Sequence, residues 1–211
     1  MNEEIIFRNR SHAGQKLAKL LKKFRAENVV VYALPRGGVI IARELAKKFG
    51  WPIDLVIVRK IGHPQNEEYA IGAISESGEA IFDELELQNI DENYLKQKSK
   101  EQQEEAKRRH KVYLTNRKSI NPHGKVAIIV DDGLATGFSM LAAIRELKKM
   151  KPKKIIVAVP VSPRDTAEKI TKEVDEFIAV EIPEIFAGAI GAYYNQFEQV
   201  SDSEVIKALK T

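Results

Sequence analysis

The chain has 211 residues, no cysteine, and a formal net charge of +4 from 34 basic and 30 acidic side chains. This length suits one globular domain with small additions. The lack of cysteine excludes disulfides and a thiolate nucleophile, and no apolar run is long enough for a membrane-spanning helix. The first residues lack the regions of a signal peptide, so we expect a cytoplasmic protein without a membrane partner.

The excess of positive charge is small for a chain in which 30% of the residues are charged. It favours nucleic acid only weakly. No basic run is interleaved with aromatic residues, which excludes a stacking platform for single strands. We therefore expect a solvated surface with a basic pocket, and nucleic acid is not an expected partner.

Strands and helices alternate along most of the sequence. An amphipathic helix is predicted over 11–26, and a polar loop over 62–68. The other predicted helices are 39–49, 138–149 and 163–173, and the predicted strands are 28–34, 53–58, 70–75, 79–82, 125–130, 153–159 and 177–182. The alternation predicts a doubly wound α/β fold, with a mainly parallel sheet and helices on both faces.

One segment, from about 91 to 118, departs from this alternation. Its helix propensity is strong, but between Lys96 and Lys111 the only apolar residue is Ala106. A helix that is polar on nearly every face is poorly held by a core. A solvated crossover arm, a mobile flap near an active site and an arm in a dimer all remain open.

The most informative run extends from Val126 to Met140. Residues 126–130 are apolar and β-branched, as in a strand covered on both faces. Asp131 and Asp132 follow at its carboxyl end, where ligands bind in open α/β sheets. Two adjacent carboxylates repel each other, and sugar hydroxyls or a divalent cation would relieve that repulsion.

A loop of small residues follows, and a predicted helix begins at its end. The loop residues are Ala135, Thr136, Gly137, Phe138 and Ser139. Free N–H groups at a helix N-terminus form an anion site. The pattern therefore predicts a ligand with hydroxyls at one end and a phosphate at the other, and a plain strand–turn–helix connection is the alternative.

Two basic turns add to this pattern. The first contains Arg36 followed by Gly37 and Gly38, which allow backbone conformations closed to other residues. In the second, Arg59 and Lys60 end the predicted strand 53–58. Either turn alone is typical of a solvated surface, but beside the acidic pair in one sheet they indicate a site for one shared anion.

From Ile128 to Ser139 the chain resembles the type I phosphoribosyltransferases, whose signature is a hydrophobic strand, two acidic residues and a Thr-Gly-x-Ser/Thr loop. The resemblance covers about residues 28–182. It implies that Asp131 and Asp132 contact the ribose 2′- and 3′-hydroxyls of phosphoribosyl pyrophosphate, and that 135–139 hold the 5′-phosphate. Hypoxanthine-guanine enzymes carry Asp where this chain has Ala135, which argues against that subclass, and adenine-type enzymes resemble it here.

The resemblance also implies a pyrophosphate site formed by Arg36, Gly37, Gly38, Arg59 and Lys60. In the family, the peptide bond after the basic residue of the first loop is often cis. The residues expected to carry catalysis are Asp131, Asp132, Arg36 and Lys60. Mg²⁺ is the implied cofactor, held mainly by substrate oxygens and water, with water-mediated contact to the acidic pair.

We expect a single domain over 1–211, with a core at about 28–182. Residues 183–211 and the N-terminal segment would form a hood over the nucleobase, where Leu134 and Phe186 are candidate base contacts. A purely structural role for Phe186 is equally open. A homo-oligomer, with a dimer favoured, is the expected assembly.

The implied activity is transfer of ribose 5-phosphate to a nitrogenous base, with release of pyrophosphate. A non-catalytic sensor of phosphoribosyl pyrophosphate is the alternative. No recognition-helix module is visible before residue 28, which lowers the case for a DNA-binding regulator. The sequence does not identify the acceptor.

Overall fold

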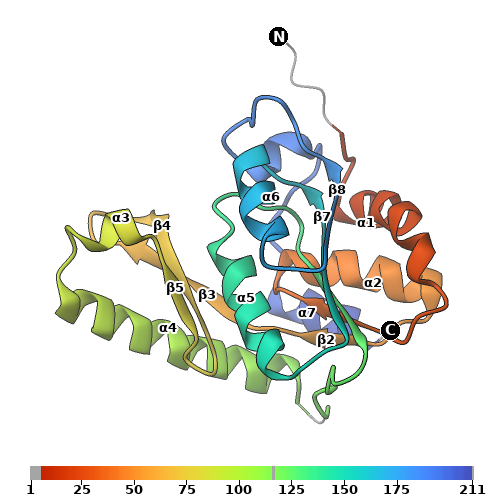
Figure 1. The fold of residues 1–211 in the computed structure, drawn as a ribbon, viewed down its shortest axis with the longest axis horizontal. Helices are drawn as coiled ribbons and strands as arrows, with labels where there is room; N and C mark the ends of the chain where they lie inside the picture. Colours follow the sequence, from red (N-terminus) through yellow and green to blue (C-terminus); the bar gives the residue numbers. More distant parts are fainter. Residues whose placement is uncertain (1–5, 116, 211) are drawn as a thin grey trace.

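A five-stranded parallel sheet forms the centre of the computed structural model, which describes residues 6–115 and 117–210. Its strand order is β2-β1-β6-β7-β8 (Figure 1). The strands are β1 (Val29–Ala33), β2 (Ile53–Leu55), β6 (Val126–Val130), β7 (Lys154–Val161) and β8 (Glu176–Glu181). Every neighbouring pair is parallel, which confirms the predicted α/β class.

Helices cover both faces of this sheet. α1 (Arg10–Leu20), the short 3-10 helix η1 (Leu21–Phe24) and α2 (Gly37–Phe49) pack on one face, and α5 (Phe138–Lys149) and α6 (Arg164–Thr171) pack on the other. In β1, Val29 and Val31 join the first hydrophobic cluster, and Val30 joins the second. Because strand side chains alternate between faces, a continuous apolar run is what a doubly covered strand requires.

A second, antiparallel sheet corrects two sequence predictions. β2 ends at Leu55 instead of 58, and the chain then forms β3 (Val58–His63), β4 (Asn66–Ser75) and β5 (Ala80–Phe82). The loop predicted over 62–68 is wrong, because β3 and β4 form a hairpin with only Pro64 and Gln65 between them. The polar side chains of Asn66 and Glu67 at the hairpin end are exposed, and backbone pairing does not depend on side-chain polarity.

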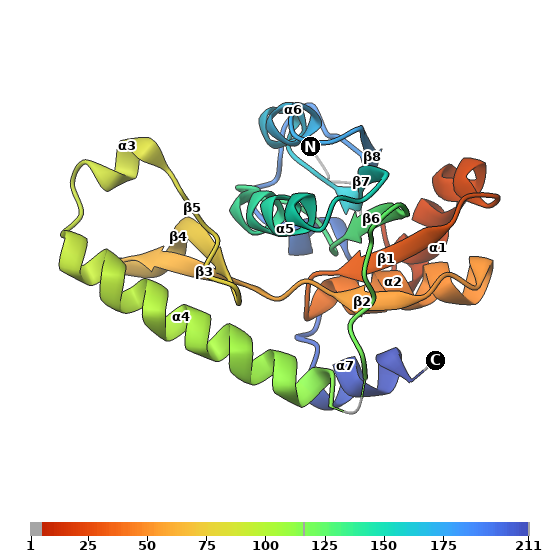
Figure 2. The same ribbon diagram turned by 60° about the horizontal axis from the view of Figure 1, so that its bottom comes forward.

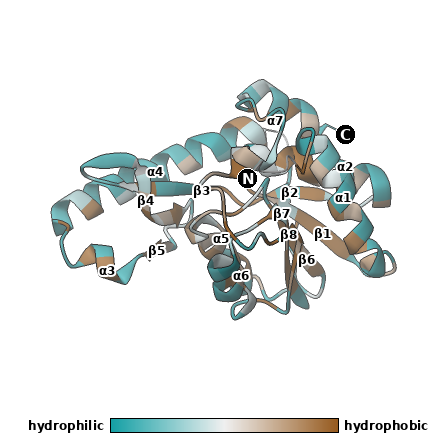
Figure 3. Ribbon diagram, turned by 90° about the horizontal axis from the view of Figure 1, so that it is seen from above, coloured by the Kyte–Doolittle hydropathy of each residue, from teal (hydrophilic) through white to brown (hydrophobic). Residues whose placement is uncertain are grey.

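The polar segment after the hairpin forms α3 (Glu84–Leu87) and the long helix α4 (Glu92–Tyr113), which ends before the predicted limit of 118. α4 is hydrophilic along most of its length (Figure 3). It nevertheless packs on β3 and β4. Ala106 and Tyr113 are buried, and Tyr94 and Leu95 cover the cluster around Ile61. α4 is therefore anchored at both ends and is not a freely solvated arm.

The C-terminal segment returns to the sheet edge and to the N-terminal segment. It contains the 3-10 helix η2 (Ile190–Tyr193) and a helix that the sequence analysis missed, α7 (Asp202–Leu209), which lies beside the end of α4 (Figure 2). Ser201 and Glu204 form the capping box that begins α7. Phe7 bridges to Tyr194. Residues 1–5 and 211 of the expected hood, and 116 of the expected arm, lie outside the described residues.

The helices within 6–115 and 117–210 include none that is both long and apolar enough to span a bilayer. The longest, α4, has 22 residues but carries charged side chains throughout.

Ala106→Gln should destabilise the protein, because the Ala106 side chain is completely buried against the main core. Overpacking of this kind costs about 1–3 kcal/mol. Urea unfolding would measure the change. Lys107→Gln introduces the same side chain at the next, exposed position and should leave the free energy of unfolding nearly unchanged. Equal stability of the two variants would show that α4 is not anchored through Ala106.

Candidate active site

The acidic pair lies where β6 ends, as predicted. The Oδ1 of Asp131 accepts a hydrogen bond from the backbone N–H of Asp132 at 2.8 Å. Burial raises the pKa of Asp131 well above its usual range, and the neighbouring charge of Asp132 adds to this, while Lys60 acts in the opposite sense. Asp131 is therefore a carboxyl group that a bound hydroxyl or cation would stabilise in its charged form.

Asp132 is held by groups that sequence reasoning missed. Its Oδ2 lies 2.6 Å from the Nε of Arg10, and these side chains are only 13% and 12% exposed. The hydroxyl of Tyr194 donates to the backbone carbonyl of Asp132 at 2.6 Å. No local pattern indicated the Arg10 contact, because 122 positions separate it from Asp132.

Arg10 also joins the acidic pair to the C-terminal segment. Its Nη1 donates to the carbonyl of Glu198 at 2.8 Å, and its guanidinium lies 3.8 Å from the ring centroid of Phe197. The rings of Phe197 and Tyr194 are 4.7 Å apart. One cation therefore connects Asp132 to the segment that the sequence assigned to a hood.

The predicted phosphate loop, 135–139, connects β6 to α5. Gly137 precedes α5 with φ +81°, a left-handed conformation that favours glycine. No described side chain caps this helix, which leaves the N–H groups of its first turn without a capping partner. The hydroxyl of Thr166 fixes the loop by donating to the carbonyl of Ala135 at 2.6 Å. The local geometry therefore suits an anion at the N-terminus of α5.

The predicted pyrophosphate loop contains Gly37 and Gly38, and we call it the glycine loop. It packs directly against the acidic pair. A Cβ at Gly37 would lie 1.8 Å from the Oδ2 of Asp132, and one at Gly38 would lie 2.7 Å from the carbonyl of Val130. Only glycine allows this approach. The cis peptide is Pro35–Arg36, one position earlier than the resemblance implied.

A cavity of about 350 Å³ joins several of the predicted residues. Asp131, Ser139 and Lys60 lie on its wall, together with Arg59. The polar helix α4 closes another side with Lys98 and Gln102, which the sequence analysis did not select. Of the readings left open for α4, this contact favours a part in the site.

Arg59 and Lys60 take different environments, as neighbours on a strand do. The Nε of Arg59 donates to the Oε1 of Gln102 on α4 at 3.0 Å. Lys60 is exposed and near enough to Asp131 to lower the pKa of that carboxyl group. The two cations therefore approach the cavity from opposite faces of β3.

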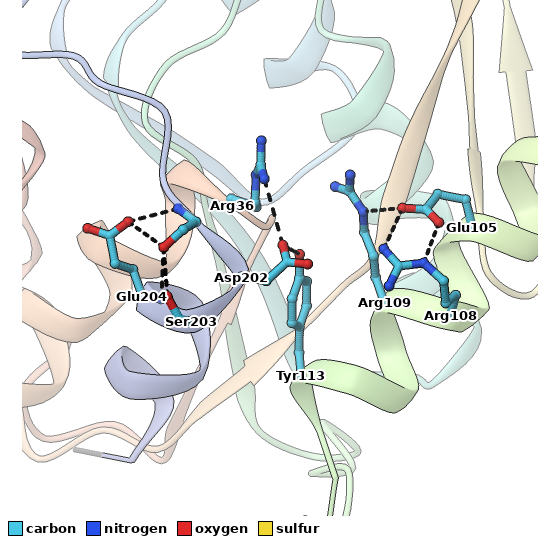
Figure 4. Close-up of polar contacts among 9 residues, drawn as sticks. Arg36, Glu105, Arg108, Arg109, Tyr113, Asp202, Ser203 and Glu204 are labelled. Carbon is cyan, nitrogen blue, oxygen red and sulfur yellow. Dashed lines mark hydrogen bonds and ion pairs between the residues drawn. The ribbon is translucent and has the colours of Figure 1, made fainter.

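Arg36 is not part of this cavity wall, and its side chain lies beside α7 and the end of α4 (Figure 4). Its Nη1 lies 3.7 Å from the Oδ1 of Asp202, which also accepts a hydrogen bond from the Tyr113 hydroxyl at 2.6 Å. Burial and this hydrogen bond raise the pKa of Tyr113 to about 12. Arg36 is thus positioned by two residues that had no predicted role.

The two candidate base contacts lie elsewhere. Leu134 is buried in the core, and its N–H donates to the carbonyl of Val161 at 2.9 Å. Phe186 is half-buried and stacks on Tyr193 with ring centroids 5.5 Å apart. Neither side chain lines the cavity that contains Asp131.

The described residues contain no group of three or more His, Cys, Asp or Glu side chains placed to hold a metal ion. Asp131 and Asp132 are the carboxylates at the end of β6, and one oxygen of Asp132 is already paired with Arg10. Mg²⁺ prefers octahedral oxygen ligands and retains several waters. This donor set fits Mg²⁺ only as an ion shared with the oxygens of a bound ligand.

The fold agrees with the comparisons. The family model of the phosphoribosyl transferase domain matches residues 4–196, so the chain belongs to that family. It is 39% identical to the protein in the crystal structure of TT1426 from Thermus thermophilus, with a TM-score of 0.79 over 96% of this chain and 97% of that one.

A curated relative from Mycobacterium tuberculosis (strain H37Rv), named "Putative phosphoribosyl transferase Rv0571c", is 36% identical over 206 residues. The counterpart from strain CDC 1551, MT0597, matches equally well. The alignment covers 97% of this chain and 46% of each relative. The chain therefore spans about half the length of the curated relatives it matches.

Arg10→Gln should destabilise the protein by about 3 kcal/mol, because it leaves the buried charge of Asp132 without its partner. Urea unfolding would measure this. Arg8→Gln, two positions earlier on an exposed side chain, should have almost no effect. Adding Asp132→Asn to Arg10→Gln should restore part of the loss. Additive losses in the double variant would show that the two groups are not coupled.

Asp131→Asn should stabilise the ligand-free protein at pH 7.5, because folding raises the pKa of this carboxyl. A raised pKa favours the protonated native state, so wild-type stability is lost as the pH rises above the unfolded value of about 4. The gain should therefore shrink as the pH falls toward about 4. Urea unfolding at several pH values would measure it.

Asp165→Asn is a matched control. The Asp165 carboxylate also accepts the N–H of the next residue at 2.8 Å, but it is exposed. Because water already solvates this exposed carboxylate, the substitution should not stabilise the protein. A gain at Asp131 that does not vary with pH would contradict the electrostatic explanation.

Proposed function

We propose that the chain transfers ribose 5-phosphate from phosphoribosyl pyrophosphate to a nitrogenous base. The observation that carries this proposal is the single cavity whose wall includes Asp131, Ser139 and Lys60. In the proposal, this one cavity brings together a carboxylate for the sugar hydroxyls, a loop for the 5′-phosphate and a cation for the pyrophosphate. Membership of the phosphoribosyl transferase domain family supports the same activity.

In this reaction the bond between ribose C1 and the pyrophosphate oxygen breaks, and a bond from C1 to the acceptor nitrogen forms. Pyrophosphate leaves with the electron pair, and the acceptor gives up a proton. Positive charge develops on the ribose ring, and negative charge develops on the leaving group. No covalent nucleophile is needed, so the protein contributes positioning and electrostatic stabilisation.

Each charge has a complementary group near the cavity. Lys60 and Arg59 would stabilise the departing pyrophosphate. Asp131 would orient the ribose hydroxyls and offset the charge on the ring. Asp132, fixed by Arg10, would contribute mainly through its negative charge and through holding the glycine loop in place.

Mg²⁺ would be held by oxygens of the bound phosphoribosyl pyrophosphate and by Asp131, directly or through water. It would neutralise charge on the pyrophosphate. The partly enclosed Asp131 suits this role because its raised pKa marks a place where a cation is favourable. The described residues alone do not form a complete cage. The affinity of Mg²⁺ for the protein should therefore depend on the donor.

The base that accepts the ribose 5-phosphate is less closely defined than the phosphoribosyl pyrophosphate that donates it. Hypoxanthine-guanine enzymes resemble this loop but carry Asp at the position of Ala135. This difference argues against that subclass. The C-terminal segment around Phe186 and Phe197 is the proposed hood over the base. We also propose that residues 1–211 act as one unit and, by family resemblance, as a homo-oligomer.

A sensor of phosphoribosyl pyrophosphate is a second candidate, favoured by one observation. Asp132 and Arg36 are both engaged by protein partners, Arg10 and Asp202, in the ligand-free protein. Incubation with phosphoribosyl pyrophosphate, Mg²⁺ and a panel of bases, with pyrophosphate as the readout, separates the two functions. Tight donor binding with no release for any base would favour the sensor.

The double variant Asp131→Asn, Asp132→Asn should reduce pyrophosphate release by at least about 100-fold, because it removes the charges that orient and stabilise the ribose. Circular dichroism would confirm that the variant is folded. Glu198→Gln, at the carbonyl contact of Arg10, changes a nearby carboxylate without touching that contact and should retain turnover. Full activity in the double variant would rule out the proposed mechanism.

A further inference from the structure

Four guanidinium groups gather where the β3 hairpin, α4, α7 and the glycine loop meet. Arg36 comes from the loop and Arg59 from β3, while Arg108 and Arg109 come from the last turns of α4. Within the part of the chain that the structure describes, Glu105 contacts Arg108 and Arg109, and Asp202 contacts Arg36. Four positive charges therefore lie beside these two negative charges.

The four arginines are not equivalent. Arg108 is 54% exposed and binds Glu105 with both Nε, at 2.6 Å, and Nη2, at 3.0 Å. Arg109 is only 16% exposed and touches the same carboxylate through Nε alone, at 2.8 Å. Two arginines lower the pKa of Glu105 to about 2. Arg109 therefore keeps donors that Glu105 does not use.

Figure 4 shows the side chains of Arg36 and Arg109 on either side of the Tyr113–Asp202 pair. The Nε of Arg59 donates to the neutral Gln102, which lies about two turns before Arg109 on α4. Arg59 therefore lies against the same helix face as Arg109, and burial and the charges of Arg109 and Arg36 lower its pKa. The half-buried guanidinium groups of Arg36, Arg59 and Arg109 lie beside two carboxylates, Glu105 and Asp202, and an anion would offset the remaining positive charge.

The geometry points to Arg109 as a further pyrophosphate-binding residue, which reaches the donor's leaving group together with Arg36 and Arg59. This inference rests on the proposed function. In it, α4 is a wall of the pyrophosphate site and not only a connection. Asp202 and Tyr113 are positioning residues that hold Arg36 on the side facing Arg109.

Pyrophosphate is the ligand that matches this cluster. A guanidinium presents paired donors to phosphate oxygens, and charge-assisted bonds of this kind are the strong ones. Arg59 belongs both to the cavity wall and to the cluster of four arginines. A donor with its ribose at Asp131 could therefore extend its pyrophosphate past Arg59 toward the cluster.

Arg109→Gln tests the inference, with Arg108→Gln as the matched control. Both substitutions remove one arginine from Glu105 and place the same side chain on the same helix. Calorimetry with Mg²⁺ and inorganic pyrophosphate should show binding about tenfold weaker for Arg109→Gln and nearly unchanged for Arg108→Gln. Ribose 5-phosphate, which lacks the pyrophosphate, should bind both variants like the wild type.

Arg109→Lys, which retains the charge, should recover part of the pyrophosphate affinity, and thermal unfolding would check that each variant is folded. Unchanged pyrophosphate binding in Arg109→Gln would overturn the inference while leaving the proposed transferase intact. Equal losses in both arginine variants would also overturn it, because the effect would then come from Glu105. Binding that depends on Arg109, without release of pyrophosphate for any base, would support the inference and count against the proposed transferase.

Discussion

The carboxylate of Asp132 and the guanidinium of Arg10 lie 2.6 Å apart, and both are almost completely enclosed. Removing one partner would leave an uncompensated buried charge. This pair allows two adjacent carboxylates to stand at the end of β6, because it compensates one of them and leaves Asp131 for a ligand. It also fixes the glycine loop, since Gly37 packs against the same carboxylate oxygen. Three segments far apart in sequence thus share one electrostatic constraint.

The second constraint is the hairpin that carries β3 away from the parallel sheet. Because β2 ends at Leu55, Arg59 and Lys60 are not at the end of a core strand but at the start of a separate sheet. That sheet supports α4, so a helix with little apolar surface is fixed beside the cavity. In the proposed site, the polarity of α4 suits this place, because a helix that faces an anionic ligand would present cations and amides to it.

Local sequence was sufficient to predict the structure of the β6–α5 segment. The apolar run, the two aspartates and the small-residue loop each follow from neighbouring residues, and the helix begins at Phe138 as predicted. Local sequence could not give Arg10 or Tyr113 a role. Their partners, Asp132 and Asp202, lie on other elements, and nothing in periodicity or turn chemistry links them. For Arg109, the i,i+4 spacing to Glu105 indicates only an ion pair on the helix surface. The S-x-x-E pattern at 201–204 did indicate the start of α7, although the sequence analysis did not use it.

The contact between Arg36 and Asp202 is informative because it is long. At 3.7 Å the pair attracts electrostatically but exceeds the usual range of a hydrogen bond. The Asp202 oxygen already accepts a short bond from Tyr113, so it holds Arg36 without satisfying its donors. A multiply charged phosphate ligand offers the guanidinium shorter bonds than this. In the proposed site, the ligand-free contact would therefore orient Arg36 for an anion at low energetic cost, and exchange toward pyrophosphate would not break a strong bond.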